Sequence, residues 1–156
     1  MNITVLAVGN KMPRWVDEAV QEYAKRFGRD VQYTLKEIKP AQRGAGVNAA
    51  QGMVAEEKRI LEALPDNAFL VVLDERGKAP TSVELAQYMQ RWQQDGEHVC
   101  FVIGGADGMT DALKQKARLM LRLSSLTLPH GMVRVLLTEQ LYRAVSILQN
   151  HPYHRE

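Results

Sequence analysis

Hydrophobic and polar residues alternate along the chain with two periods, one typical of β-strands and one typical of α-helices. Short runs of apolar or β-branched residues predict five strands, at residues 3–8, 31–38, 68–73, 99–103 and 124–128. The third and fourth runs are continuously apolar, which is typical of strands that are covered on both faces. The second run alternates and therefore indicates a half-exposed strand.

A segment with helical spacing follows each predicted strand. The five predicted helices cover residues 14–27, 48–64, 81–94, 110–119 and 132–150. Three of their N-termini have residues that can act as caps, namely Asn48, Thr81 or Ser82, and Thr110. We expect a basic loop at residues 40–46, a turn at 74–78 and no regular structure in the tail HPYHRE.

The alternation of strand and helix predicts an α/β fold, a single domain with a mostly parallel sheet and helices on both faces. The chain of 156 residues has the usual length of one such domain. Sheets of this kind bind ligands beyond the carboxyl ends of their strands. The segments after residues 73, 103 and 128 are therefore the first places to search for a functional site.

Composition narrows the class of protein. Hydrophobic residues make up 46% of the chain and charged residues 24%, which is ordinary for a soluble globular domain. No apolar stretch reaches the length of a membrane span, about 18 residues, and the first apolar run lacks the basic residues of a signal peptide. Cys100 is the only cysteine, so no internal disulfide can form, which fits a reducing compartment. We therefore expect a cytoplasmic protein.

Charge is distributed unevenly along the sequence. Residues 1–43 hold 8 Lys or Arg against 5 Asp or Glu, residues 44–108 hold 5 against 10, and residues 109–156 hold 7 against 3. If the two basic ends meet in space, they form a positive surface suited to a polyanion. Chance variation along an ordinary surface would produce the same pattern, so charge alone leaves both interpretations open.

The sequence GGADG, from Gly104 to Gly108, lies between a predicted buried strand and a predicted helix. Glycines in this position let backbone N–H groups approach a ligand closely. The spacing differs from the dinucleotide-binding and Walker motifs, so it does not identify the ligand. A tight connection between strand and helix is the alternative interpretation.

The segment LSSLTLPH, residues 123–130, places hydroxyl groups, backbone amides and aliphatic side chains at another strand end. Pro129 restricts the backbone, and His130 begins the last helix. These groups could hold a flat, partly apolar ligand between aliphatic walls. A plain strand, turn and helix start fits the same pattern.

The last predicted helix carries an apolar stripe that is wider than one sheet face would cover. Its members are Val133, Leu136, Leu137, Leu141, Ala144, Val145 and Leu148. This width indicates either deep burial or a subunit interface. Arg134 lies within the stripe and has two possible partners. One is Glu139 in an ion pair, and the other is a phosphate group of a ligand.

Three of the four histidines, His130, His151 and His154, lie in the last 27 residues. Histidine exchanges protons near neutral pH, so this cluster, with Tyr153 and Arg155 beside it, is a candidate catalytic site. No cysteine or carboxylate stands nearby at zinc-binding spacing, and we expect no metal. The order of residues typical of a catalytic triad is missing, so hydrolytic chemistry has little support.

Five stretches, spread nearly from end to end, carry a resemblance to one family: LAVGNKMPRW, LDERGK, FVIGGADGM, LSSLTLPHGMVRVLLTEQLYRA and NHPYHRE. The chain resembles the trefoil-knotted methyltransferases of the SPOUT class, and within them the small bacterial pseudouridine N3-methyltransferases of large-subunit ribosomal RNA. The last two stretches are long and unlike a general α/β pattern, which makes the resemblance specific.

The resemblance implies a C-terminal trefoil knot, formed by the chain from about Val99 onward, with S-adenosylmethionine bent inside it. Carried over residue by residue, the cofactor contacts are Leu73, Gly104, Gly105, Leu123, Ser124, Ser125, Leu126, Thr127 and Leu128. The resemblance also implies a homodimer in which the last helices pack together and one subunit's tail completes the other's site. The implied acceptor is a pseudouridine of 23S ribosomal RNA, methylated in the 70S ribosome or the large subunit.

Methylation of pseudouridine at N3 requires removal of an imide proton, so the site needs a base or a stabilising cation. From the resemblance, His154 is the first candidate for the base, Tyr153 is its stacking or hydrogen-bonding partner, and Arg134 neutralises phosphate or developing charge. The expected RNA-binding residues are basic and come from both ends of the chain: Lys11, Arg14, Arg26, Arg43, Arg143 and Arg155, with Lys25, Arg29 and Lys39 nearby.

Two other functions are compatible with the residue patterns. A non-catalytic nucleotide- or rRNA-binding module of flavodoxin-like fold would explain the glycine segment but would leave LTLPH and the tail without a purpose. An assembly factor that binds ribosomal RNA without chemistry is the other. Binding of S-adenosylmethionine would separate an enzyme from both.

Overall fold

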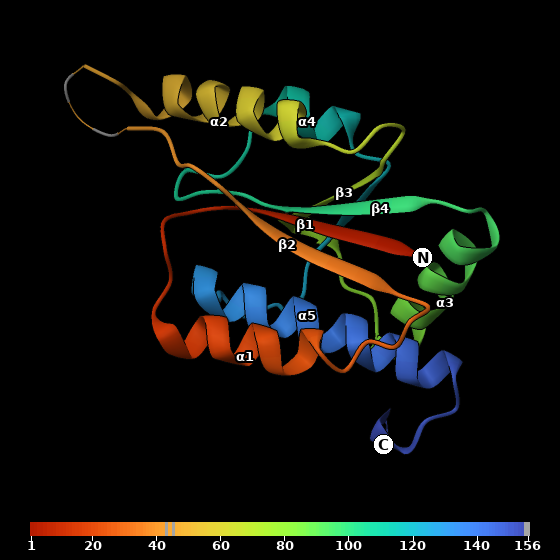
Figure 1. Cartoon of the computed structure of the whole chain (residues 1–156). Helices are drawn as coiled ribbons and strands as arrows, with labels where there is room; N and C mark the ends of the chain where they lie inside the picture. Colours follow the sequence, from red (N-terminus) through yellow and green to blue (C-terminus); the bar gives the residue numbers. More distant parts are fainter. Residues whose placement is uncertain (43, 45, 155–156) are drawn as a thin grey trace.

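The strands form one parallel sheet with helices on both faces (Figure 1). The computed structural model describes residues 1–42, 44 and 46–154. The strands are β1 (Asn2–Val8), β2 (Gln32–Ile38), β3 (Phe69–Lys78), β4 (His98–Ile103) and β5 (Leu119–Leu121). Their order across the sheet is β2-β1-β4-β3-β5, and each neighbouring pair is parallel. The predicted α/β class and parallel sheet are confirmed.

The helices cover the sheet in two layers. They are α1 (Arg14–Ala24), α2 (Ala49–Ala63), α3 (Ser82–Gln94), α4 (Asp111–Lys116) and α5 (His130–Leu148), followed by a 3-10 helix, η1 (Pro152–His154). Helices α2 and α4 lie on one face, and α1 and α5 lie on the other, with α3 packed against α5 (Figure 1). Asn48 and Thr81 form capping boxes and Thr110 caps α4, as predicted. Within the described ranges, no helix is long and apolar enough to span a membrane.

Strand residues alternate between two hydrophobic clusters, one on each side of the sheet. In β4, Phe101 packs with residues of α3 and α5, whereas its neighbours Cys100 and Val102 pack with residues of α2 and α4. Consecutive strand residues point to opposite faces, so a strand covered on both sides needs an uninterrupted apolar run. The predicted burial of residues 68–73 and 99–103 on both faces is confirmed for the central part of each run.

The turn predicted at residues 74–78 is wrong, because β3 continues to Lys78. The continuation pairs with β5: Leu73 lies opposite Leu121, and after an irregular stretch Lys78 also lies opposite Leu121. The polar sequence DERGK favours a turn by composition, but strand pairing at the edge of the sheet overrides this local preference.

The fifth strand lies at residues 119–121, so the strand predicted at 124–128 is wrong. Helix α4 correspondingly ends at Lys116 and not at residue 119. The hydrophobic pattern alone cannot distinguish a strand of three apolar residues from the end of a helix. Pairing with β3 makes residues 119–121 a strand. Helix α5 begins at His130, as expected from the Pro129-His130 sequence and two residues before the apolar helical pattern starts. The 3-10 helix η1 forms in the tail, where no regular structure was expected.

The chain passes very close to itself where β5 meets the end of β3. A Cβ atom at Gly77 would lie 2.5 Å from the carbonyl carbon of Leu121. The N–H of Arg122 donates to the carbonyl of Lys78 at 2.8 Å. Only glycine allows this approach of two backbones. The trefoil knot stays a prediction.

Candidate active site

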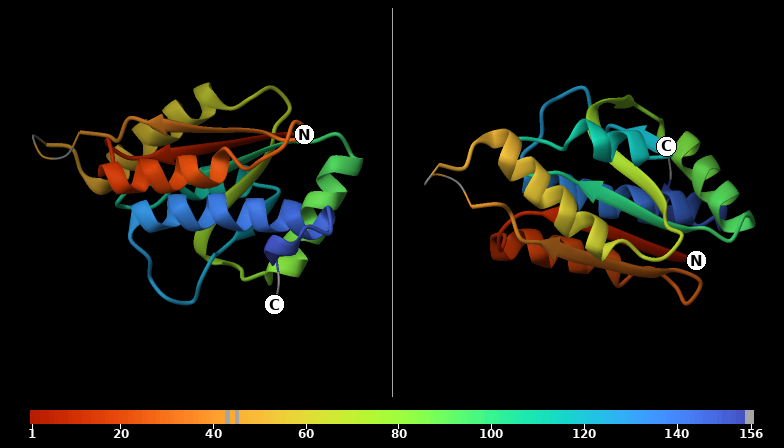
Figure 2. Two further views of the ribbon diagram at one scale, coloured as in Figure 1. Left: turned by 60° about the horizontal axis from the view of Figure 1, so that its bottom comes forward. Right: turned by 90° about the horizontal axis from the view of Figure 1, so that it is seen from above.

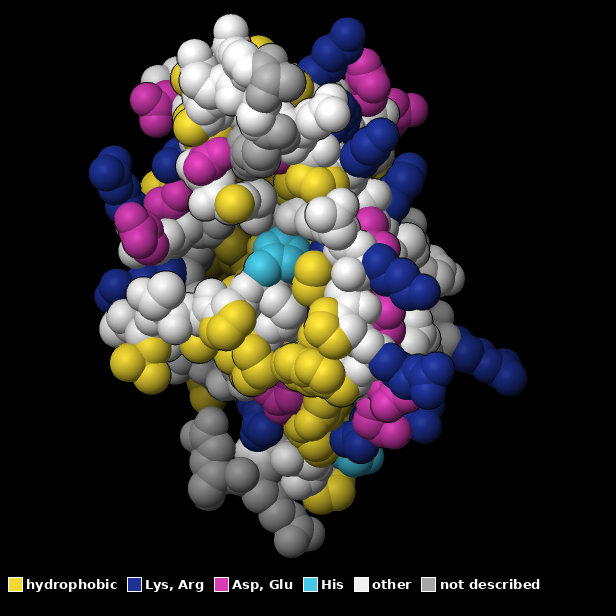
Figure 3. Space-filling view, turned by 90° about the vertical axis from the view of Figure 1, so that its left-hand side faces the viewer, with side chains coloured by type: hydrophobic (Ala, Val, Ile, Leu, Met, Phe, Trp, Pro, Cys, Tyr) yellow, Lys and Arg dark blue, Asp and Glu magenta, His cyan; other side chains and the backbone are white. Residues whose placement is uncertain are grey.

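The predicted cofactor-binding residues lie on or shortly after three adjacent strands, at the level where β4 and β5 end and where β3 continues past Leu73. Leu73 pairs with Ile103 of β4 on one side and with Leu121 of β5 on the other. Gly104 directly follows Ile103, and the segment 123–128 begins two residues after β5. Hydrophobic side chains gather around a histidine on this side of the molecule (Figure 3). Ligands of parallel α/β sheets bind at this edge.

The segment 123–128 is an open loop and not the predicted strand. The Leu126 N–H donates to Ser124 Oγ at 2.8 Å, which forms a local turn. Leu126 is 77% exposed and lies between the exposed residues Ser125 and Thr127, while Leu123 packs against the core. An exposed apolar side chain beside hydroxyls and backbone amides suits a partly apolar ligand.

The glycine turn of residues 104–108 is packed too tightly for larger residues. A Cβ atom at Gly104 would lie 2.9 Å from Met109 Cγ, and one at Gly105 would lie 3.0 Å from Glu56 Oε1. Gly108 has a φ of 82° and donates its N–H to the Gly105 carbonyl at 3.0 Å. Packing therefore accounts for Gly104 and Gly105, and the positive φ accounts for Gly108.

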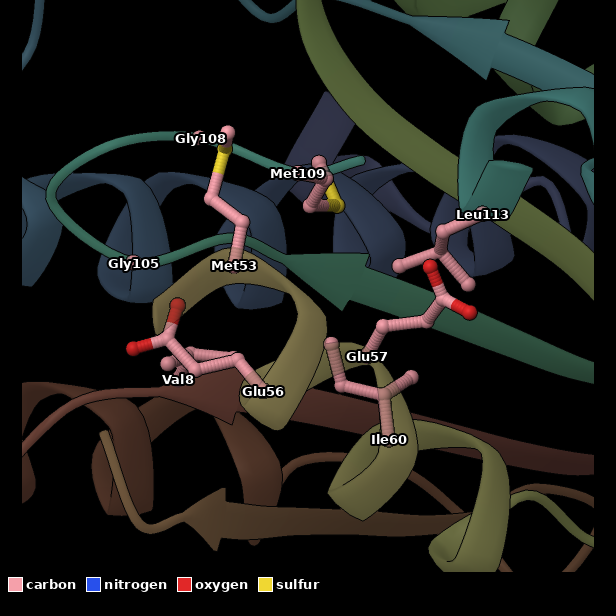
Figure 4. Close-up of a pocket in the computed structure, with 9 residues that line it drawn as sticks. All are labelled: Val8, Met53, Glu56, Glu57, Ile60, Gly105, Gly108, Met109 and Leu113. Atoms are coloured by element: carbon pink, nitrogen blue, oxygen red, sulfur yellow. The ribbon is translucent and has the colours of Figure 1, made fainter. Parts of the chain in front are cut away.

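Of two adjacent carboxylates of α2, Glu56 lies against the glycine turn and Glu57 lies toward the start of α4 (Figure 4). Glu56 is 2% exposed, and its Oε2 accepts the N–H of Ala41 at 2.8 Å, while its Oε1 lies against Gly105. The Thr110 hydroxyl donates to the neighbouring Glu57. A buried carboxylate is stable only when such donors surround it. Helix α2 thus connects the loop before it to the turn.

A charged network lies under the same turn, on the side of α5. Arg134 is 1% exposed, and its Nη1 donates to Glu37 Oε2 at 2.8 Å. Its Nε donates to His130 Nε2 at 3.0 Å. Burial and the Arg134 charge lower the pKa of His130, whereas a hydrogen bond with the Gly104 backbone and the Glu37 charge act in the opposite direction. The balance favours a neutral imidazole at neutral pH.

The ion pair between Arg134 and Glu139, one of the two alternatives that the sequence left open, does not form. Residues five positions apart do not face each other on a helix, and Glu139 pairs with Arg143 at 2.8 Å instead. The sequence interpretation missed Glu37, the true partner of Arg134. Its only signal is its place near the carboxyl end of β2, at the edge where the other site segments meet.

The tail folds back onto α5 of its own chain. The Tyr153 hydroxyl donates to Glu139 Oε2 at 2.7 Å, and the Tyr153 and Tyr142 ring centroids are 4.8 Å apart. The guanidinium carbons of Arg143 and Arg26 lie 4.9 and 5.8 Å from the Tyr153 ring centroid. Burial and the bond to Glu139 raise the pKa of Tyr153, so its phenol stays protonated at neutral pH.

His154 is half-buried in η1. Its Nδ1 atom is buried and has no hydrogen-bond partner among the residues that the structure describes. His151 is exposed and accepts the Tyr153 N–H through Nδ1 at 3.2 Å. Of the two tail histidines, His154 is therefore the one with a buried ring nitrogen that no described residue satisfies.

The structure does not bring the tail and the glycine turn together within one chain. His130, at the start of α5, contacts Gly104, whereas the tail follows the opposite end of the helix (Figure 2). A helix of 19 residues is about 28 Å long. The cofactor and acceptor candidates of a single chain are therefore separated by most of the length of α5.

Two of the predicted RNA-binding residues, Lys11 and Arg14, are exposed at the start of α1, beside Trp15. Trp15 is 53% exposed, so an apolar ring accompanies the positive charges. Arg43 and Arg155 lie outside the described residues.

The other two predicted RNA-binding residues pair with carboxylates. Arg26 lies 3.0 Å from Glu22, and Arg143 lies 2.8 Å from Glu139. Their charges are thus partly neutralised. The described part of the chain holds no group of three or more His, Cys, Asp or Glu side chains arranged to bind a metal ion.

Known proteins resemble this chain over its whole length. A family model described as "Predicted SPOUT methyltransferase" matches residues 1–154. Proteins named ribosomal RNA large subunit methyltransferase H are 86% identical in Neisseria meningitidis serogroup C (strain 053442) and 63% identical in Chromobacterium violaceum. Both alignments cover 100% of this chain and 100% of the relative.

Two solved structures share the fold at low sequence identity. A probable methyltransferase from Bordetella pertussis Tohama I is 17% identical with a TM-score of 0.54, covering 92% of this chain and 95% of that one. A probable methylase family protein from Haemophilus influenzae Rd KW20 is 15% identical with a TM-score of 0.58, covering 99% of this chain and 70% of that one. The family match and the full-length relatives lead to one conclusion: the chain belongs to the SPOUT methyltransferase family.

Proposed function

We propose that this protein is an S-adenosylmethionine-dependent methyltransferase that methylates N3 of a pseudouridine in 23S ribosomal RNA of the assembled ribosome. The observation that carries the proposal is 86% identity over all 156 residues to a protein named ribosomal RNA large subunit methyltransferase H. The sequence stretches that resemble the pseudouridine N3-methyltransferases support the assignment of pseudouridine as the modified base and of N3 as the methylated atom.

The carboxyl edge of the sheet fits S-adenosylmethionine chemically. The loop 123–128 offers backbone groups and exposed hydroxyls for hydrogen bonds to adenine and ribose, and Leu73 and Leu126 offer apolar surface. Gly104 and Gly105 would line the remaining side. Bound there, S-adenosylmethionine would supply an activated methyl group, so the protein's task is to hold donor and acceptor in line.

A homodimer would complete the site. The tail of each chain lies at the far end of α5 from its own glycine turn, so an antiparallel pairing of two α5 helices would place each tail near the partner's turn. Val135 and Leu136 are half-buried in the middle of α5 and available for such a contact. Apolar side chains that stay partly exposed on a helix favour an interface.

The acceptor imide must lose its N3 proton before or during attack. His154 is the proposed base, because its buried Nδ1 has no partner among the described residues. The raised pKa of Tyr153 makes its phenol a donor or a stacking surface and not a base. Arg134 is 1% exposed, so we assign it an electrostatic effect from beneath the glycine turn.

Methyl transfer to three substrates tests this function. Labelled S-adenosylmethionine is supplied with 70S ribosomes, free large subunits or naked rRNA, and the modified base is mapped by mass spectrometry. We expect one N3-methylated pseudouridine, formed fastest in the 70S ribosome. A different modified base would contradict the substrate assignment, and no binding of S-adenosylmethionine in calorimetry would contradict the enzyme.

The base assignment has its own test. We expect His154→Ala to lower the single-turnover rate on ribosomes by about 100-fold, as loss of a general base does. The exposed His151 provides the matched control, and His151→Ala should keep most of the rate. Equal rates for His154→Ala and the unchanged protein would remove His154 from this role.

A further inference from the structure

We infer that His130 is a positioning residue for the glycine turn, held in place by a relay that runs from Glu37 through Arg134. The inference rests on the proposed function in one respect, the assignment of this turn to the cofactor. Two links are side-chain hydrogen bonds, Glu37 to Arg134 at 2.8 Å and Arg134 to His130 at 3.0 Å. The third is the interaction of His130 with the Gly104 backbone, which acts to raise the pKa of His130.

The relay selects one tautomer of His130. Arg134 has only donors, so the Nε2 atom that it contacts must be an acceptor without a proton. The proton of the neutral ring therefore resides on Nδ1. The hydrogen bond with Gly104 favours the protonated ring, so the Gly104 backbone group is the carbonyl, which accepts from Nδ1–H.

Burial of the Arg134 guanidinium costs free energy. Arg134 is 1% exposed, and its Nη2 atom is buried without a hydrogen-bond partner among the described residues. Apolar side chains of similar volume usually stabilise a core at least as well as a buried charge does. The relay fixes the orientation of the His130 ring, because it connects β2 and the start of α5 to the carbonyl that follows β4.

Protonation of His130 would break the relay. The Nε2–H would then face the Nε–H of Arg134 at a distance that suits a hydrogen bond and not two donors. The charged groups that act on the ring are Arg134 of α5 and Glu37 of β2, and the neighbouring chain segments after β1 and β4 contribute Gly9 and Gly104. A second cation beside Arg134 would therefore displace the imidazole from Gly104.

The first test measures affinity for S-adenosylmethionine by calorimetry. We expect His130→Ala to weaken binding about tenfold, the effect of one lost hydrogen bond to a carbonyl. His130→Asn should recover most of the loss, because its amide can still donate to Gly104. On ribosomes, the KM for S-adenosylmethionine should rise in His130→Ala while kcat at saturating cofactor changes little.

The pH profile separates positioning from simple folding. The pKa of His130 lies below that of an ordinary histidine, so the affinity of the unchanged protein should fall as the pH drops below the ordinary histidine range and the ring gains a proton, whereas His130→Asn should show no such fall. Equal affinities and equal pH profiles for all three proteins would overturn the inference.

A second variant keeps the inference testable if His130 variants do not fold. A Cβ atom at Gly9 would lie 2.9 Å from Arg134 Nη2 and 3.2 Å from His130 Nε2, so Gly9→Ala should displace the relay and weaken binding as well. Gly28→Ala is the matched control, because nothing lies within 4 Å of its Cβ position. Affinity of Gly9→Ala equal to that of Gly28→Ala would count against the relay.

Nuclear magnetic resonance distinguishes failure of the inference from failure of the proposed function. The Gly105 amide, which follows the Gly104 carbonyl, should shift when His130 titrates and should not shift in His130→Asn. If the unchanged protein binds no S-adenosylmethionine but this shift occurs, the proposed function fails and the relay stands. If the shift is absent, the relay fails regardless of cofactor binding.

Discussion

At the scale of single residues, Glu56 forms a buried structural contact with the loop before α2. It is 2% exposed and accepts the Ala41 N–H at 2.8 Å. We expect Glu56→Ala to lower the free energy of unfolding by about 1–3 kcal/mol, because a buried backbone N–H loses its acceptor. Urea denaturation measures this. Glu62→Ala, an exposed site on the same helix, should change stability by less than about 0.5 kcal/mol.

Cys100 provides a second prediction at this scale. Burial raises the pKa of its thiol to about 12, and the side chain is fully covered in the sheet. Only the thiolate reacts with alkylating reagents, so the folded protein should resist iodoacetamide at about pH 8. Mass spectrometry should detect modification only at urea concentrations that unfold the chain. Fast labelling without urea would mean that β4 opens locally.

At the scale of elements, the contact between β3 and β5 depends on Gly77. A Cβ there would lie 2.5 Å from backbone atoms of Leu121, which cannot yield as a flexible side chain can. We expect Gly77→Ala to lower the midpoint of thermal unfolding by at least about 4 °C, equivalent to about 1–2 kcal/mol or more. Gly28→Ala, with open space at its Cβ, serves as the control. Similar midpoints for both variants would show that β5 can move away from β3.

At the scale of the whole molecule, the separation of tail and glycine turn leads to a subunit-mixing experiment. If the proposed homodimer forms, His154→Ala and Gly104→Val should each be inactive on their own, the second because its side chain meets Met109. Co-refolded in equal amounts, they should recover about a quarter of the unchanged activity, since half of the dimers would contain one intact composite site. No recovery would place the whole site within one chain.

The basic N-terminal segment predicts a salt-dependent affinity for ribosomal RNA. Each phosphate contact changes the slope of log affinity against log salt by roughly 0.7–0.9. Lys11→Ala and Arg14→Ala, at exposed positions, should each reduce that slope by about one. Lys58→Ala, exposed on α2, should leave it unchanged. A flat salt dependence of the unchanged protein would remove this surface from RNA recognition.

Much of the fold could be predicted from local patterns. Continuous apolar runs identify β3 and β4 as central strands, because only strands covered on both faces can bury every residue. Capping residues locate the starts of α2, α3 and α4, because the cap acts through local hydrogen bonds. The loop after Ile103 follows directly from the end of β4, whereas β3 continues past Leu73.

The elements that the patterns misplaced depend on distant partners. LML becomes β5 only because β3 offers a free edge, and the polar end of β3 stays extended only because β5 pairs with it. No window of local sequence contains both strands. The same holds for Arg134, whose partner Glu37 lies 97 positions away in the sequence.

By itself, the sequence determines the order of strands and helices, the residues of the core and the stretches that place the chain in its family. These depend on burial and hydrogen bonding within a few residues, and local chemistry is sufficient for both. Only the tertiary structure decides that Glu37, Arg134, His130 and Gly104 form one relay, and that the tail lies a helix length from the glycine turn. Such relations join residues whose separation in the chain carries no information about their distance in space.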